Sequence, residues 1–232
     1  MKKIIFFLTF VFILSNYSFG REVKIISLNG NVAVRHGIQE EWVSAAVGDI
    51  LKPDDSIESG KNSSITLLVD GRTKITIPES VIIDISDLRV VTQDELLLKI
   101  AMESIRAIPR DKSDDELYIP RITTVHGENR GSVSNKITLS TEIGLKQLKG
   151  SKILFDNKYY ATSILRAKEV FRIYPELKTK TEFHLMVAEA FEKLNLLEEA
   201  LNEYLNLFNE ELSPKEKKYV AEKIESLKKE NE

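Results

Sequence analysis

The sequence predicts an α+β chain with two parts, an all-β N-terminal half and an all-α C-terminal half. From about residue 22 to 86, apolar and β-branched residues alternate with polar ones at a period of two, and turn dipeptides separate the runs. From about residue 139 to the end, apolar residues recur at helical spacing instead. The change of period near Thr92 therefore divides the chain.

The first 20 residues have the layout of a secretory signal peptide. Lys2 and Lys3 precede a short apolar run, and small residues at Ser18 and Gly20 provide a cleavage site before Arg21. The run is shorter than the ~20 residues that a transmembrane helix needs. An uncleaved membrane anchor is the alternative to a cleaved signal peptide. We expect a periplasmic or secreted protein that does not span the membrane after cleavage.

Composition excludes several classes of function. The formal net charge is −3, and it becomes −5 when the two lysines of the signal peptide are removed. Mild acidity is unfavourable for binding nucleic acid or anionic lipid. The chain has no Cys, so disulfides and thiol nucleophiles are excluded and an exported chain depends on its core alone.

The β-half, residues 21–91, reads as a series of short strands. Asn29-Gly30 predicts a hairpin with a type I′ turn, and Asp70-Gly71 predicts a second turn of the same kind. Between them, Ile65, Leu67 and Val69 alternate with polar or smaller residues. The pattern predicts a sandwich, a barrel or a short solenoid.

A connecting helix and a linker follow. Thr92 and Glu95 form a capping-box pattern, which predicts a helix over residues 92–108 that stops before Pro109. Residues 109–138 are polar and read as a linker, with one strand predicted at Ile119–Val125.

The helical half, residues 139–232, contains an internal repeat. The stretch Phe155–Pro175 resembles the stretch Glu192–Leu212, and Asn157 matches Asn195 at an offset of 38. Thr179 with Glu182 predicts one helix start, and Ser213-Pro214-Lys215-Glu216 predicts the start of a final capping helix. A plain helical bundle is the alternative to a repeat.

The repeat resembles the tetratricopeptide repeat, whose period is about 34 residues. The residues that carry this resemblance are Tyr160, Ile164, Ala167, Val170 and Pro175 in the first unit and Ala190, Phe191, Asn195, Leu197, Ala200, Leu201, Tyr204 and Phe208 in the second. The resemblance implies helical hairpins with a concave face that holds a protein segment.

The β-half resembles a FecR-type domain. The matching residues are Gly30, Val32, Val34, Trp42, Val47, Gly48, Asp49, Leu51, Asp55, Ile57, Gly60, Leu67, Asp70, Gly71, Ile75, Ile77, Pro78 and Ser80, and Ser59 stands where Thr is usual. The resemblance implies a periplasmic sensing or assembly module. Regulators of this family carry a cytoplasmic segment and a transmembrane helix before the domain, whereas here it directly follows the signal peptide.

The acidic stretch Val47–Gly60 is interpreted as turns rather than a site. Gly48-Asp49 and Ser59-Gly60 supply positive φ and side-chain caps, as do Asp70 and Gly71 later. The acids do not follow the spacing of a calcium loop, and Lys61 lacks the glycine of a phosphate loop. With no nucleophile or metal-ligand motif in the chain, we expect no enzyme activity, no cofactor and no metal.

The sequence thus favours a non-catalytic envelope protein that binds a protein partner through its repeats. Lys152, Glu182, Glu189 and Lys193 are the candidate partner-binding residues, because they are polar and fall on the first helix of each unit. The alternative is a cell-wall or polysaccharide-binding accessory protein, in which Trp42 and Tyr118 stack on sugar. Core packing is the competing role for Trp42.

Overall fold

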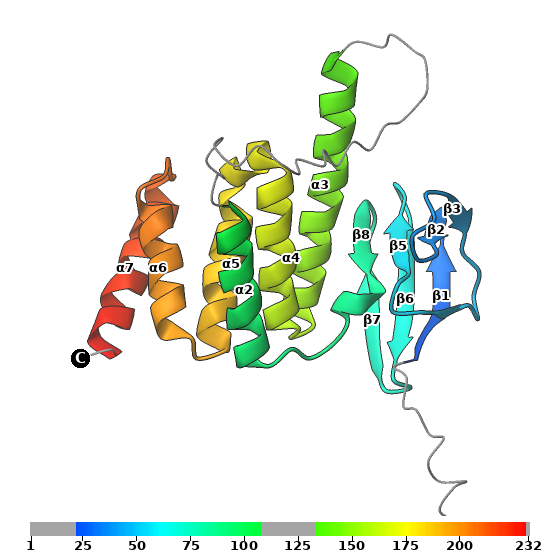
Figure 1. The fold of residues 1–232 in the computed structure, drawn as a ribbon, viewed down its shortest axis with the longest axis horizontal. Helices are drawn as coiled ribbons and strands as arrows, with labels where there is room; N and C mark the ends of the chain where they lie inside the picture. The colour runs from blue at the N-terminus through cyan, green and yellow to red at the C-terminus, as the bar shows by residue number, and fades with distance from the viewer. Residues whose placement is uncertain (1–21, 108–132, 231–232) are drawn as a thin grey trace, which may run out of the picture.

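A computed structural model describes residues 22–107 and 133–230. The predicted signal peptide, Tyr118, the predicted strand Ile119–Val125 and most of the predicted linker lie outside these ranges. Figure 1 shows the strands at one end of an elongated molecule and the helices lined up beside them, ending at α7. The two-part α+β architecture is therefore confirmed.

The β-half is a sandwich of two four-stranded antiparallel sheets. One sheet has the order β4-β1-β6-β7, and the other has the order β3-β2-β5-β8. The strands are β1 (Val23–Asn29), β2 (Val32–Arg35), β3 (Trp42–Ser44), β4 (Ile50–Leu51), β5 (Ser56–Ser59), β6 (Ser64–Val69), β7 (Thr73–Ile77) and β8 (Val81–Asp84).

Alternation along the strands builds the sandwich core. In β6, Ile65, Leu67 and Val69 are buried while the residues between them are partly exposed. Val34 and Ile57 face them from the second sheet as part of the same buried cluster. Each such side chain contributes roughly 1.5–3 kcal/mol on burial, which suits a domain without disulfides.

One predicted hairpin forms and the other does not. Asp70 and Gly71 both have positive φ, of 52° and 65°, and join the paired strands β6 and β7. The prediction at Asn29-Gly30 is wrong, because β1 and β2 belong to different sheets. Gly30 (φ 78°) instead carries the chain across the sandwich, where a Cβ would lie 2.5 Å from the Ser63 hydroxyl.

The helical part consists of a connecting helix, two hairpins and a final helix. After the short 3-10 turn η1 (Ile85–Asp87), α2 (Gln93–Ala107) packs on α4. The other elements are α3 (Val133–Asp156), α4 (Tyr160–Ile173), the 3-10 turn η2 (Pro175–Thr179), α5 (Thr181–Lys193), α6 (Leu197–Phe208) and α7 (Pro214–Glu230). Helix α3 begins at Val133, so the helical part starts before the predicted residue 139.

The hairpins α3–α4 and α5–α6 are equivalent, but at an offset of 37 residues rather than 38. Both inter-helix turns contain a matching backbone bond, from Tyr159 N to the Leu154 carbonyl and from Leu196 N to the Phe191 carbonyl. At this offset Lys158 corresponds to Asn195, and both have positive φ, of 67° and 58°. The sequence alignment matched the two asparagines and was therefore displaced by one residue.

The predicted helix starts have different outcomes. The box at Ser213 is complete: Glu216 N donates to the Ser213 hydroxyl, and Ser213 N donates to the Glu216 carboxylate at 2.9 Å. At Thr92 only half of the box is present, because Glu95 turns its carboxylate to Arg89. The start predicted from Thr179 is wrong, since α5 begins after Lys180 without a side-chain cap.

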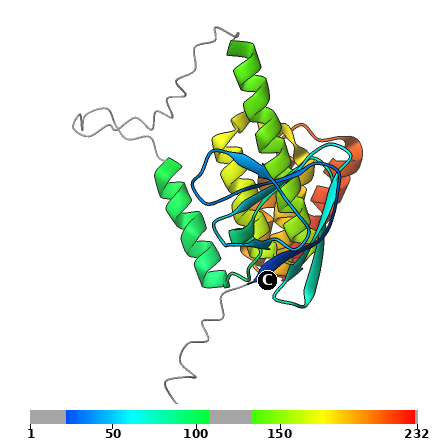
Figure 2. The same cartoon turned by 90° about the vertical axis from the view of Figure 1, so that its right-hand side faces the viewer.

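Helix α3 joins the two halves by packing along β8. A Cβ at Gly150 would lie 2.1 Å from the Ile82 carbonyl oxygen, so a side chain cannot be accommodated there. Leu154, one turn on, is buried in the sandwich cluster. Lys146 reaches Glu58 on β5 at 2.8 Å. In Figure 2, which is viewed from the β end, the strands lie in front of the helices. Helix α3 thus covers the edge that β8 would otherwise expose.

Candidate functional site

A cleft of about 370 Å³ lies where α3 and α5 meet the turn between β7 and β8. We call it the α3–α5 cleft. Its residues are Pro78, Glu79, Val81, Leu145, Lys149, Lys152, Ile153, Glu182 and Phe183. Both structural halves therefore contribute to the same cleft, with apolar side chains from the sandwich, from α3 and from α5.

The α3–α5 cleft combines an apolar floor with charges of both signs. Phe183 is buried, whereas Lys149 and Glu182 are exposed. The Lys152 ammonium pairs with Asp156 one turn later at 2.6 Å, and both side chains are about half exposed. An exposed i,i+4 pair of this kind contributes little to stability, so Lys152 can exchange partners at small cost.

The structure brings two of the four predicted partner-binding residues together. Lys152 and Glu182 line the α3–α5 cleft from neighbouring helices. Glu189 lies farther along α5 and accepts a hydrogen bond from the Tyr219 hydroxyl at 2.9 Å, which ties α5 to α7. Lys193 is exposed at the end of α5.

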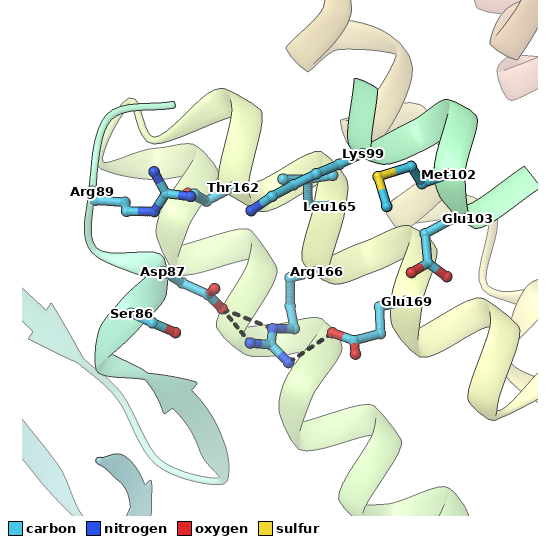
Figure 3. A pocket seen from close by; sticks show the side chains of 10 residues that line it. All are labelled: Ser86, Asp87, Arg89, Lys99, Met102, Glu103, Thr162, Leu165, Arg166 and Glu169. Atoms are coloured by element: carbon cyan, nitrogen blue, oxygen red, sulfur yellow. Dashed lines mark hydrogen bonds and ion pairs between the residues drawn. The ribbon is translucent and has the colours of Figure 1, made fainter. Parts of the chain in front are cut away.

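A second cleft, of about 400 Å³, lies between η1, α2 and α4. Figure 3 shows this junction cleft, with Arg166 of α4 between Asp87 and Glu169. The Arg166 guanidinium lies 2.7 Å from Asp87 and 3.1 Å from Glu169, and it also pairs with Asp84 at the end of β8. Arg166 therefore gathers three carboxylates and links the β-half to the helices.

Burial controls the protonation of this cluster. It raises the pKa of Asp87 to about 6, although the positive charge of Arg166 partly opposes the shift. Burial alone would lower the pKa of Arg166, but Asp87, Asp84 and Glu169 outweigh it and keep the guanidinium charged. The Asp87 carboxyl thus titrates within the range of ordinary biological pH.

The other cation near η1 is also paired. Arg89 donates two hydrogen bonds to Glu95, and these bonds, aided by Lys99, lower the pKa of Glu95 to about 2. The junction cleft holds acids and guanidinium groups in mutual ion pairs. We interpret it as a structural junction between the two halves.

A partly buried charge cluster joins α4, α5 and α6. The His184 ring stacks on Phe171, with centroids 4.1 Å apart, and its Nδ1 lies 3.4 Å from Glu203. Lys168 approaches the same carboxylate at 2.8 Å. Burial would raise the pKa of Glu203, but hydrogen bonds from His184 and Lys168 lower it instead. Across the described ranges, no three His, Asp or Glu side chains cluster so as to hold a metal ion.

The acidic stretch that begins at Val47 forms turns in which its carboxylates bind backbone. Asp49 accepts from Ala46 N and Asp55 from Lys52 N, each at 2.8 Å. Gly48 has φ 103°, as its turn requires. Gly60 does not have positive φ, contrary to expectation. At this position a Cβ would lie 3.0 Å from the Asn31 carbonyl oxygen, which is a tight contact.

Trp42 lies in the edge strand β3 and is half-buried. The Arg35 guanidinium lies 5.2 Å from the ring centroid. The Arg35 guanidinium also donates a hydrogen bond to the Ser56 hydroxyl at 3.0 Å, and the Ser56 hydroxyl donates one to the Asp84 carboxylate at 2.6 Å. These four residues occupy one cross-strand row of the sheet β3-β2-β5-β8. Asp84, the last residue of the row, pairs with Arg166. A chain of side-chain contacts therefore links Trp42 to the junction cleft.

Sequence reasoning missed the central residues of both clefts. Arg166 was not singled out, because nothing in a helical pattern distinguishes an interdomain arginine from a solvated one. Asp84 and Asp87 lie just where the β-pattern ends, and their convergence on α4 depends on how α3 docks. Phe183 is one apolar residue among many in the helical half, and its position beside Pro78 of the sandwich depends on the tertiary structure.

Comparison with protein-family models, with curated proteins and with solved structures finds no match. The described helices include none with the length and apolar composition needed to cross a bilayer. The geometry of this chain and the resemblances in its sequence are therefore the indications of its function.

Proposed function

We propose that this protein is a non-catalytic, exported module of the cell envelope that binds a segment of a partner protein in the α3–α5 cleft. The observation that carries the proposal is the joint placement of Lys152 and Glu182 on an apolar cleft shared by the two halves. The resemblance to FecR-type and tetratricopeptide-like sequences supports a sensing or scaffold role.

The chemistry of the cleft indicates what its occupant must present. Its volume is near the lower end of the roughly 300–1,000 Å³ that ligand pockets have. Phe183 and Ile153 favour an apolar anchor side chain. Lys149 and Lys152 on α3 favour an acidic neighbour, whereas Glu182 on α5 favours a basic one. We infer a peptide segment with one large apolar residue between charges of opposite sign.

The location of the cleft favours a protein segment over a small molecule. It opens between the first helices of the two equivalent hairpins, the position where helical repeats bind extended or helical peptides. Glu189 and Lys193 extend the polar surface along α5 beyond the cleft. A segment anchored beside Phe183 and following α5 would meet these residues in turn.

The polysaccharide alternative remains a sequence-based hypothesis. Arg35 lies over the ring of Trp42, and that contact competes with sugar stacking. Tyr118 lies outside the described residues. Since no structural observation favours this alternative, we retain the protein-binding proposal.

The test is site-specific photo-crosslinking in cells that make the protein. A benzophenone amino acid at position 182 should capture one defined partner, whereas the same group at Glu222, exposed on α7, should not. A synthetic peptide of the cross-linked segment should then bind the purified chain by calorimetry. The double charge reversal Lys149→Glu and Glu182→Lys should weaken the binding of this peptide at least tenfold. Equal binding by this variant, or cross-links independent of position, would contradict the proposal.

A further inference from the structure

The edge strand β8 of the sandwich is covered by a helix, whereas the edge strand β3 at the other side of the same sheet is not. At the helical end α3 packs along β8. At the opposite end the edge strands are β3 in one sheet and β4 in the other. We call residues 38–50, which comprise β3, the loop on either side of it and Ile50 at the start of β4, the open edge. Most of its residues are exposed and none is fully buried.

The backbone of β3 has hydrogen-bonding groups directed away from the sheet. Ala45 N donates to the Val32 carbonyl, and in an antiparallel ladder the bonded pairs alternate. Val43 therefore bonds to Val34, whereas the N–H and C=O groups of Trp42 and Ser44 point outward. No described residue forms a backbone hydrogen bond with these outward groups. Another extended chain can pair with them.

The open edge is also unusually apolar for an exposed surface. Ile38 is 102% exposed, Val47 61%, Ile50 60% and Val43 40%. Val43 is opposite Val34 in the register and so lies on the core-facing side of its sheet. A strand added beside β3 would continue this core-facing row and cover Val43. An exposed, core-facing valine on an unpaired edge strand is a surface that an added strand can cover.

Charge identifies the class of partner. Glu40 and Glu41 directly precede β3 and are exposed, as are Asp49 and Asp54 farther along the chain, whereas the exposed basic residues include Lys52 and, opposite Ile50 on β1, Lys24. Two copies of this acidic edge would repel one another, since like charges across a strand pair are destabilising. A basic strand would be attracted instead.

We propose that the open edge is a strand-addition site for a basic, extended segment of another protein. The segment pairs with the outward backbone groups of Trp42 and Ser44, places apolar side chains over Val43, and directs its Lys or Arg residues to Glu40 and Glu41. This surface is separate from the α3–α5 cleft, and it does not depend on the function proposed there.

The probe is a synthetic heptapeptide, acetyl-Lys-Val-Thr-Val-Lys-Val-Lys-amide. Trp42 is the one tryptophan of the chain and lies on the edge itself, so its fluorescence reports occupancy directly. We expect saturable binding with a Kd on the order of 10–100 µM, weak because the contact is far smaller than a standard interface. An analogue with Glu in place of Lys should bind at least tenfold more weakly.

Two variants separate backbone pairing from charge. Ser44→Pro removes an outward N–H and leaves the ladder to β2 intact, so it should abolish binding. Glu40→Lys with Glu41→Lys should weaken binding at least tenfold. Glu222→Lys with Glu225→Lys makes the same charge change on α7 and should have no effect. If Ser44→Pro disturbs folding, a probe N-methylated at alternate backbone amides supplies the same test on the wild-type chain.

Three results would overturn the proposal. The first is equal binding of the acidic and basic peptides. The second is unchanged binding of the N-methylated probe. The third is concentration-dependent self-association by sedimentation that Ser44→Pro removes, which would make a second copy the occupant. Reversing the charges of the α3–α5 cleft with Lys149→Glu and Glu182→Lys should leave heptapeptide binding unchanged, so the two sites are tested separately.

Discussion

Gly150 of α3 meets the carbonyl group of Ile82 in β8 so closely that a Cβ atom at position 150 would lie 2.1 Å from the oxygen. The obstructing atom belongs to backbone, which cannot rotate away as a side chain can. This contact fixes how near the helices stand to the sandwich. It therefore sets the geometry of the α3–α5 cleft, to which both halves contribute.

Gly150→Ala is expected to destabilise the protein, although alanine favours a helix by about 1 kcal/mol over glycine. The clash requires α3 to withdraw from β8, and overpacking of this kind costs typically 1–3 kcal/mol. Urea denaturation measures the change. Lys149→Ala, at the exposed neighbouring position, is the control and should be nearly neutral. An increase in stability for Gly150→Ala would show that α3 is not held against β8.

Arg166→Met tests the charge cluster of the junction. Without the guanidinium, Asp84, Asp87 and Glu169 face one another in a half-buried site. Removing one partner of a buried ion pair costs roughly 3–5 kcal/mol. Limited proteolysis between the halves should become faster, and the unfolding midpoint should fall. Arg172→Met removes an ion pair with Glu103 that is far more exposed, so it should cost well under half as much. Equal effects would argue against a special role for Arg166.

Asp87 gives the junction a defined pH dependence. Its pKa in the fold, about 6, lies above the usual 3.8, so the native state binds the proton more tightly than the unfolded chain does. Asp87 therefore contributes stability at low pH, and this contribution is lost as pH rises through 6. The penalty above pH 7 is about 2–3 kcal/mol, since one pKa unit corresponds to about 1.4 kcal/mol.

Asp87→Asn should consequently be more stable than the wild type at pH 7.5, and the difference should shrink as the pH approaches 5. Parallel urea titrations at several pH values measure it, and comparing the two proteins cancels the titration of other groups. Glu169→Gln changes a more exposed partner of Arg166 and provides the control. A difference independent of pH would show that Asp87 ionises normally.

The sequence predicted the two-part architecture because its signals are local. Alternation identified the strands around Ile65, and the box at Ser213 identified the start of α7. The wrong hairpin at Asn29-Gly30 has a tertiary cause: a sandwich connection and a hairpin turn both use a glycine with positive φ. The partners of Gly30 lie near Ser63, which the local sequence cannot reveal.

The candidate site was predictable only in part. Lys152 and Glu182 followed from their places on the first helix of each hairpin. The apolar cleft between them also needs Pro78 and Val81 from the β-half. That half meets α3 through backbone contact at Gly150, and a glycine inside a helix carries no information about its neighbour. The predicted alignment of the two repeats was displaced by one residue for a similar reason. It paired Asn157 with Asn195 by identity, whereas the backbone conformation pairs Lys158 with Asn195.

The corrected register leads to a final prediction at Lys158. This residue corresponds to Asn195, and each lies two residues after the first helix of its hairpin with positive φ, of 67° for Lys158 and 58° for Asn195. A left-handed conformation costs a residue with a Cβ roughly 1–2 kcal/mol, and asparagine and glycine tolerate it best. Lys158→Gly should therefore stabilise the protein by about 1 kcal/mol, Lys158→Asn by somewhat less, and Asn195→Ala should destabilise it by a similar amount.

Lys152→Gly, inside α3, is the matched control and should be destabilising. If Lys158→Gly were destabilising while Lys158→Asn were neutral, the Lys158 side chain rather than its backbone would govern the turn, and the 37-residue equivalence would lose its energetic basis.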